Sequence, residues 1–183
     1  MGMAAPLYYT ADMVRALPDD GNRYEVVHGE LLVTPAPRLW HEEVAGRLFE
    51  TVRAYLRRYP VGLAIGSRSD LSWGLRDVLV SPDLFVVPLD EARRLDWLVL
   101  RNVLLAAEVL SPSSLRADRF TKRRLYQERG VPLYWVVDPD AHSVEVWQPA
   151  DDLPRTELET LVWHPAGSAE PFTLPLAELF RPI

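Results

Sequence analysis

The clearest periodicity in the chain lies in residues 40–59, where apolar side chains recur every three or four positions. Val44, Leu48, Val52 and Tyr55 fall on one helical face, and arginine and glutamate occupy positions between them. This spacing predicts an amphipathic helix with a single apolar stripe.

A second long helix is predicted to begin at Ser113 or Ser114, because either hydroxyl can cap it, and to last to about residue 129. Gly130 then favours a left-handed stop at the C-terminal end. Short helices are expected over residues 10–17 and at the end of the chain.

Short apolar runs bounded by glycine, proline or aspartate predict strands. The strongest run, residues 103–110, is apolar except for one glutamate, which suits a strand buried on both faces. A hairpin is predicted where His28 and Gly29 separate two alternating runs. The predicted strands cover residues 23–27, 30–33, 62–65, 69–73, 83–87, 103–110, 133–137, 144–147, 158–163 and 172–174.

The order of these elements predicts an α/β fold with a mixed (α+β) sheet. Its centre has the order helix, three strands, helix, strand, with an added N-terminal hairpin and C-terminal strands. One sheet should carry the functional site, and two helices should cover it. The sequence shows no repeat or linker, and 183 residues is the size of one ordinary domain. We therefore expect a single domain over residues 1–183.

Composition excludes several classes of protein. The chain has no cysteine, which rules out disulfide scaffolds, thiolate zinc sites and cysteine nucleophiles. Its apolar runs are shorter than the roughly 20 residues of a membrane span, and its start does not have the pattern of a secretory signal, so a cytoplasmic protein is expected. The net charge of -6 weakens the case for a protein that coats nucleic acid by bulk attraction.

Two acids in apolar strands are the main candidates for chemistry. Asp83 begins the run DLFVV, and Glu108 lies inside LLAAEVL. A buried carboxylate must be paired, hydrogen-bonded or bound to a metal, and two on neighbouring strands repel each other unless a cation lies between them. Hard oxygen ligands suit Mg²⁺ or Mn²⁺. Alternatively, Asp83 caps the turn after Pro82, and Glu108 pairs with a buried arginine.

Lys122 is the sole lysine among the 20 basic residues. Asp118, Lys122 and Tyr126 are spaced four apart, so they share one face of the predicted second helix. The ammonium could reach over the sheet edge towards Glu108, or it could form an ordinary surface pair with Asp118. Several basic residues gather on the same predicted helix: Arg116, Arg119, Lys122, Arg123 and Arg124. They could form a face that contacts phosphates, or they could simply face solvent.

Several blocks together resemble a known family. These are SPDLFVV with Asp83, AEVLSPSS with Glu108, the DxxxK spacing of Asp118 and Lys122, and GVPLYWVVD. They resemble the PD-(D/E)XK nuclease superfamily, and within it the Uma-two family of restriction-endonuclease-like proteins. The opening block RYEVVHGELLVTPAP resembles that family too, and it places Glu25 and, further on, His41 at matching positions.

The resemblance implies a restriction-endonuclease-like core and a metal-dependent endonuclease that cuts nucleic acid, DNA rather than RNA. Asp83 and Glu108 would hold Mg²⁺ or Mn²⁺, Lys122 would orient the attacking water, and Glu25 and His41 would assist. The superfamily usually has its lysine two residues after the glutamate, where this chain has Leu110. Cutting both strands of a duplex needs two sites, so a homodimer is expected.

Alternatives remain open at this stage. Glu25 could be the solvent-facing member of an alternating strand, and His41 could be a capping or surface residue. The acidic net charge and the displaced lysine also fit a catalytically inactive binding or assembly module with a nuclease fold. A phosphodiesterase that acts on a nucleotide is a third possibility.

Overall fold

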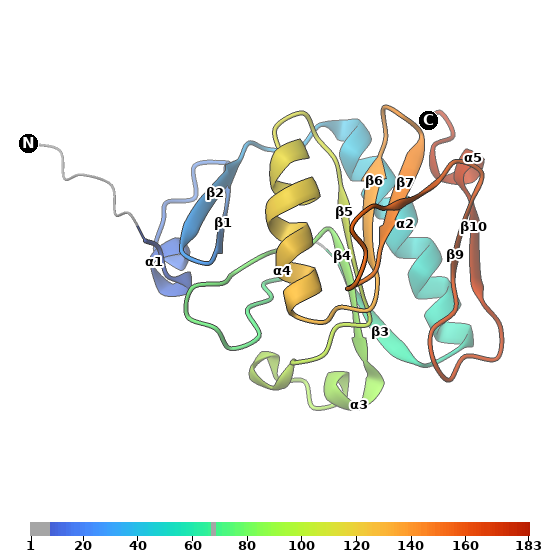
Figure 1. Cartoon of the computed structure of the whole chain (residues 1–183), viewed down its shortest axis with the longest axis horizontal. Coiled ribbons are helices and arrows are strands. Elements are labelled where there is room, and N and C mark those ends of the chain that lie inside the picture. Colours follow the sequence, from blue (N-terminus) through green and yellow to red (C-terminus); the bar gives the residue numbers. More distant parts are fainter. Residues whose placement is uncertain (1–7, 67–68) are drawn as a thin grey trace, which may run out of the picture.

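A six-stranded mixed sheet crosses the centre of the molecule (Figure 1). The structure is a computed structural model that describes residues 8–66 and 69–183. Only β5 and β6 pair in parallel, and the other neighbours are antiparallel. The strands, in their order across the sheet, are β3 Gly62–Gly66, β4 Leu84–Pro88, β5 Leu105–Val109, β6 Tyr134–Asp138, β7 Ser143–Trp147 and β8 Arg155–Glu157.

Long helices cover both faces of this sheet (Figure 1). One face is covered by α2 (Leu39–Arg58), together with the hairpin of β9 (Thr160–Trp163) and β10 (Phe172–Pro175) and the short α5 (Leu176–Leu179). The other face is covered by the helix that ends in α4 (Arg123–Glu128). A second hairpin lies beside α4 and is formed by β1 (Arg23–Val27) and β2 (Glu30–Thr34). Shorter elements are α1 Ala11–Arg15, α3 Leu89–Ala92 and a 3-10 turn at Trp97–Val99.

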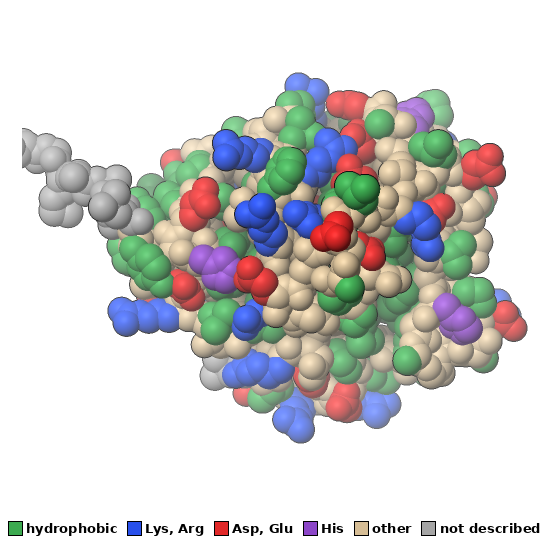
Figure 2. Space-filling model, viewed as in Figure 1, with side chains coloured by type: hydrophobic (Ala, Val, Ile, Leu, Met, Phe, Trp, Pro, Cys, Tyr) green, Lys and Arg blue, Asp and Glu red, His purple; other side chains and the backbone are tan. Residues whose placement is uncertain are grey.

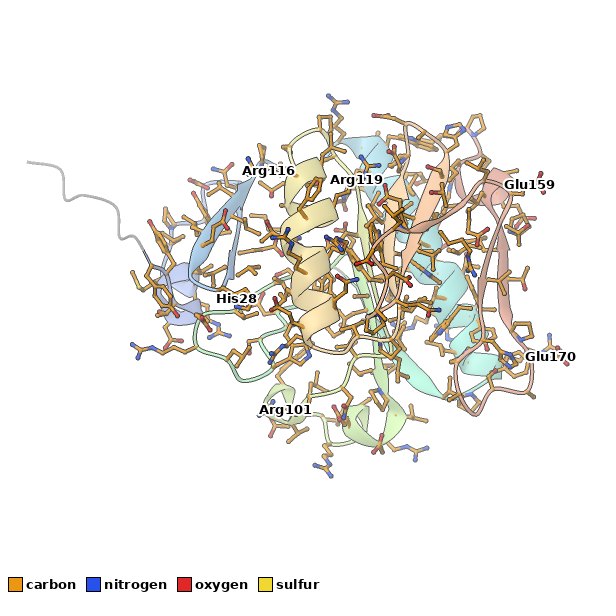
Figure 3. All side chains as sticks on the ribbon, in the orientation of Figure 1. His28, Arg101, Arg116, Arg119, Glu159 and Glu170 are labelled. Atoms are coloured by element: carbon orange, nitrogen blue, oxygen red, sulfur yellow. The ribbon has the colours of Figure 1, made fainter. Side chains whose placement is uncertain are left out.

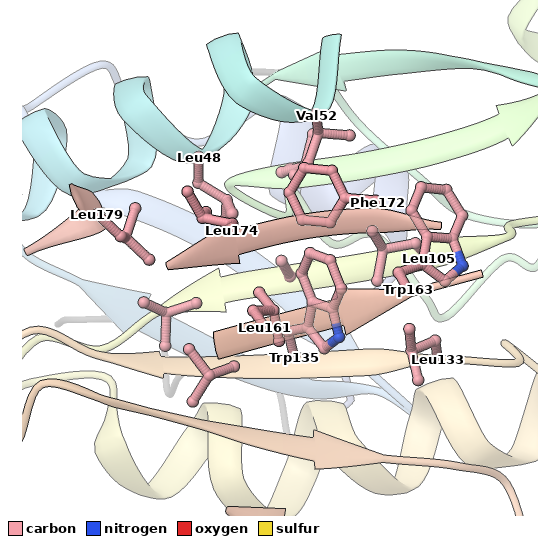
Figure 4. Close-up of a cluster of buried hydrophobic side chains, with 14 of the residues drawn as sticks. Leu48, Val52, Leu105, Leu133, Trp135, Leu161, Trp163, Phe172, Leu174 and Leu179 are labelled. Atoms are coloured by element: carbon pink, nitrogen blue, oxygen red, sulfur yellow. The ribbon is translucent and has the colours of Figure 1, made fainter. Parts of the chain in front are cut away.

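The core between the sheet and α2 is built from the apolar stripe of the long helix. Leu48 and Val52 pack against Leu105 of β5 and against the aromatic rings of the C-terminal hairpin (Figure 4). The ring centroids of Trp135 and Phe172 are 6.0 Å apart. The period of 3.6 in the helix and the period of two in the strand thus bring both apolar faces together.

The opposite face of the same strands carries a second core that includes charge. Phe85, Ala106 and Tyr126 belong to this core, packed under α4. Side chains alternate along a strand, so Asp83 and Glu108 point to this face as well. The site therefore lies between the sheet, α4 and the N-terminal hairpin.

The structure confirms the α/β fold with its mixed sheet and the order of its central elements. The predicted strand at residues 69–73 is wrong, since Leu71 makes only an isolated bridge to Val80. Trp73 and Gly74 have φ values of 51° and 74°, and two left-handed residues turn the chain out of an extended strand. The short β8 was not predicted. Within the described ranges, no helix is both long and apolar enough to cross a bilayer.

The second predicted helix differs from expectation in its middle. Residues Ala117–Lys122 form a π-helical turn, and the α-helical hydrogen bonds resume at Arg123. Such wide turns are rare, and they are frequent at functional sites. Gly130 ends the helix with φ 65°, as the sequence predicts.

Shortening an apolar side chain of β5 should destabilise the protein. We expect Leu105→Ala to lower the free energy of unfolding by about 2–5 kcal/mol, because Leu105 is fully buried and the substitution leaves a cavity. Urea denaturation monitored by tryptophan fluorescence measures this change. The matched control Leu153→Ala, at a side chain that is 81% exposed, should change stability by less than about 0.5 kcal/mol. Equal effects of the two variants would contradict this account of the core.

Candidate active site

Asp83 immediately precedes β4, Glu108 lies on the adjacent strand β5, and both face the same side of the sheet. Leu84 pairs with Ala107 in the antiparallel register of β4 and β5, and one further step sets Asp83 opposite Glu108. The backbone N–H of Val109 donates to Asp83 Oδ2 over 2.9 Å. Both carboxylates are buried. Strand register therefore brings together two acids that are 25 positions apart in sequence.

Lys122 lies beneath its helix and reaches the same place. Its Nζ is 2.8 Å from Glu25 Oε2, 3.1 Å from Glu108 Oε1 and 3.2 Å from Asp118 Oδ1. Only 3% of Lys122 is exposed, so the interpretation of a surface pair with Asp118 is wrong. Burial alone lowers the pKa of Lys122, but the carboxylates of Glu108, Glu25 and Asp118 outweigh it and hold that pKa well above its ordinary value. The ammonium is therefore charged at neutral pH.

Glu25 is held inside the protein and does not face solvent. β1 is tied to the segment before β4 by a bridge between Val26 and Leu79. Beside this bridge, the backbone N–H of Ser81 donates to Glu25 Oε1 over 2.7 Å, while Oε2 faces Lys122. The alternative of a solvent-facing Glu25 is therefore wrong.

His41 and Arg23 both contact Asp83. His41 Nε2 lies 3.3 Å from Asp83 Oδ2, and Arg23 donates to Asp83 Oδ1 over 3.2 Å. Burial raises the pKa of Asp83, but contacts with His41, Arg23 and the Val109 N–H lower it by more. The pKa of Asp83 is therefore below its ordinary value. Burial lowers the pKa of His41, but the hydrogen bond and charge of Asp83 raise it by more, with a net increase.

Glu108 has the opposite electrostatic balance. Its Oε1 accepts hydrogen bonds from Lys122 Nζ and from the hydroxyl of Tyr126, the latter over 2.9 Å. Burial is the main reason that the pKa of Glu108 is raised well above its ordinary value; Lys122 opposes the rise, and Asp118, Asp83 and Glu25 add to it. The surroundings of Glu108 therefore favour its protonated form, in contrast to those of Asp83.

Arg23 and Tyr126 were not predicted as site residues, and Asp118 was predicted only as a possible surface partner of Lys122. Arg23 stands two positions before Glu25 on β1, so strand alternation places both on one face; this signal could have identified Arg23. Tyr126 and Asp118 share the face of Lys122, as the spacing predicted, but spacing does not reveal that this face is buried. Leu110 belongs to the apolar core under α4.

A small cavity lies among these side chains. Its free volume is about 20 Å³, which is enough for one water molecule or ion. Its lining includes the end of β2, the loop after it and the turn before the second helix: Thr34, Pro35, Pro37, Ser111 and Ser114. The carboxylates, the ammonium and the imidazole line the rest.

The donor set fits a hard divalent cation. Four carboxylates, those of Glu25, Asp83, Glu108 and Asp118, face two fixed cations, Lys122 and Arg23. Among the described residues, no three His, Asp or Glu side chains form a preassembled metal centre. This is compatible with Mg²⁺, which commonly takes one or two protein carboxylates, keeps several waters and completes its shell with substrate phosphate. Asp83 and Glu108, neighbours across two strands and both lining the cavity, could hold such an ion.

The basic residues of the second helix divide into two groups. Lys122 is internal, Arg119 pairs with Glu145 and Asp138, and Arg123 lies over the ring of Trp147 at 4.5 Å. Arg116 and Arg124 are exposed. The five residues therefore do not form one phosphate-contacting face, and two of them remain available at the surface.

Removing the internal ammonium should destabilise the fold. We expect Lys122→Met to lower the free energy of unfolding at pH 7 by about 3–5 kcal/mol, because Glu25, Glu108 and Asp118 would stay buried without a cation. Chemical denaturation measures the loss. Arg124→Met, an exposed position on the same helix, serves as the control and should stay within about 0.5 kcal/mol. A loss below about 1 kcal/mol for Lys122→Met would contradict the burial of this ion pair.

His41 should make stability depend on pH. Because the pKa of His41 is raised in the folded state, its protonation contributes stability that is fully present below pH 6.5 and is lost as pH rises through the folded pKa. In metal-free buffer, the stability difference between the wild type and His41→Gln should therefore shrink from pH 6 to pH 9. Thermal unfolding across this range checks the trend, and a difference that widens with pH would contradict it.

Comparisons with known proteins agree with this geometry. The crystal structure of a putative nuclease belonging to DUF820 from Anabaena variabilis ATCC 29413 superposes with a TM-score of 0.77 and 22% sequence identity, covering 94% of this chain and 97% of that one. This likeness supports the fold. No curated protein matches the sequence significantly. The family model described as "Uma2: Putative restriction endonuclease" matches residues 11–176, nearly the whole chain. The chain belongs to this nuclease family.

Proposed function

We propose that the protein is an endonuclease that hydrolyses phosphodiester bonds of DNA with Mg²⁺ or Mn²⁺. The observation that carries the proposal is the convergence of Asp83, Glu108 and Lys122 on one small cavity. Membership of a nuclease family supports nucleic acid as the substrate. The preference for DNA over RNA rests on analogy with restriction endonucleases.

Asp83 and Glu108 would hold the metal ion. When bound, a divalent cation there polarises a phosphate oxygen and lowers the pKa of a bound water. The Val109 N–H, His41 and Arg23 fix the Asp83 carboxylate in its orientation. Tyr126 fixes Glu108 in the same way through its hydroxyl. The surroundings of Asp83 thus favour its ionised form, whereas Glu108 would gain its charge as it binds a cation.

Lys122 would orient the attacking water and stabilise developing negative charge. An ammonium has three N–H donors, and the three nearby carboxylates of Glu25, Glu108 and Asp118 match that number. A water that takes the place of one of these acceptors would be held by Lys122 while the other two keep the ammonium in position. Lys122 would then do from the helix what a lysine at position 110 does in the superfamily pattern.

We also propose that the protein is a homodimer. A duplex break needs two cuts, and a homodimer supplies two sites. The edge strands β3 and β8 and the C-terminal segment could contribute to its interface. We also propose a cytoplasmic location.

A binding module without turnover is the second candidate. The specific observation in its favour is that the ligands already have partners: Asp83 accepts from three groups, and Lys122 has ion pairs with three carboxylates. A metal ion would have to replace some of these contacts. Affinity for a divalent cation therefore distinguishes the enzyme from the module.

Plasmid nicking tests the proposed function. With Mn²⁺, the wild type should nick supercoiled DNA, and Asp83→Asn or Glu108→Gln should reduce the rate by about 10²-fold or more, because each removes a charged ligand. Calorimetry should show Mn²⁺ binding to the wild type and its loss in both variants. Glu50→Gln, an exposed acid on α2, is the matched control and should nick normally.

The outcomes separate the candidates. A folded wild type that neither binds Mn²⁺ nor nicks DNA would favour the module. Nicking that persists in both acid variants would place the chemistry elsewhere. Inhibition of nicking by micromolar nucleotide, together with hydrolysis of that nucleotide, would favour a nucleotide phosphodiesterase.

A further inference from the structure

A groove separates the N-terminal hairpin from the second helix, on the outer side of the candidate active site. It has a volume of about 670 Å³, within the range of small-molecule sites. The hairpin contributes Val27, His28 and Glu30, and the helix contributes Phe120 and its basic neighbours. Figure 3 labels Arg116 near the end of the helix beside β2 and His28 at the turn of the hairpin.

The helix side of this groove presents an aromatic ring between two free cations. Arg116, Phe120 and Arg124 are spaced four apart, and all three line the groove. Phe120 is 55% exposed, which is unusual for a large aromatic side chain. Among the residues that the structure describes, neither Arg116 nor Arg124 has an ion pair or a side-chain hydrogen bond. Figure 2 shows basic side chains gathered over α4 on this face of an otherwise acidic protein.

Two acids line the groove: Glu128 at the C-terminal end of the helix wall, four positions after Arg124, and Glu30 on the hairpin wall. Glu128 is paired with His28 over 2.8 Å, and Glu30 is exposed on the hairpin side. A ligand with negative charge would therefore follow the helix wall. The first turn of this helix, around Ser114, also borders the cavity that holds Asp83 and Glu108. The groove and the candidate active site thus share one helix.

We infer that this groove binds single-stranded nucleic acid, with a base stacked on Phe120 and backbone phosphates paired with Arg116 and Arg124. An exposed aromatic ring accepts any base, and flanking guanidiniums neutralise phosphates. The inference deepens the proposed function and rests on its substrate class. It makes the groove the place where a strand is held beside the cleavage site.

Binding without cleavage tests the inference. A fluorescein-labelled 12-nucleotide single strand is titrated in EDTA, and fluorescence anisotropy gives the affinity. Phe120→Ala should weaken binding about five- to a hundred-fold, the effect of losing one stacked base, while Phe120→Tyr should bind as the wild type does. The double variant Arg116→Ala/Arg124→Ala should weaken binding and lower the slope of log K against log salt by about 1.4, since two phosphate contacts are lost.

The matched control is Arg93→Ala/Arg94→Ala, which removes two exposed arginines away from the groove. Equal losses in the two double variants would overturn the inference in favour of bulk charge. An unchanged affinity of Phe120→Ala, or no measurable binding by the wild type, would also overturn it. Plasmid nicking separates this inference from the proposed function. A wild type that binds the single strand through Phe120 but never nicks DNA would support the groove and overturn the endonuclease. If the wild type nicks DNA but the Phe120 and arginine variants bind the single strand as the wild type does, the inference about the groove is overturned and the endonuclease stands.

Discussion

The structure depends on burying four carboxylates together without leaving their charge uncompensated. Isolated ionised carboxylates in an apolar core cost several kcal/mol each, so every acid of the cluster needs a partner. Lys122 contacts three of the four, and Arg23 and His41 contact the remaining one. The N-terminal hairpin, α2, the sheet and the second helix each contribute a member. Electrostatic compensation thus links elements that apolar packing alone would not hold in this arrangement.

The π-helical turn belongs to the same arrangement. It covers Asp118 and Lys122, both buried, and it lies over the strand that carries Glu108. A wide turn costs backbone hydrogen-bond geometry, and here it coincides with the segment whose side chains enter the charged cluster. Arg119 and Arg123, on the other sides of the helix, are held by Glu145 and Trp147. The helix is therefore held both by the buried cluster and by contacts of Arg119 and Arg123 with β7.

Much of this could be predicted from the sequence, and the failures have physical causes. Periodicity gave α2 within one residue at each end, and the alternation of β1 and β2 gave the hairpin, because both signals are local. Acids in apolar strands and the spacing along the helix indicated Asp83, Glu108 and Lys122, and the resemblance added Glu25 and His41. The structure gathers all five, and their roles stay predictions. The contact of Arg23 with Asp83 and the burial of Lys122 depend on tertiary packing, which no local pattern reports. The failed strand at residues 69–73 reflects backbone turning at Trp73, a residue whose β propensity points the other way.

The spread of the charged cluster along the chain has a consequence for biosynthesis. Its members range from Arg23 on β1 to Tyr126 on the second helix. A nascent polypeptide that has emerged only as far as β5 therefore carries Glu25 and Glu108 without the ammonium of Lys122. Both acids gain this cation only when the second helix packs onto the sheet. The cavity that Lys122 helps to line is therefore complete only after the second helix has been synthesised.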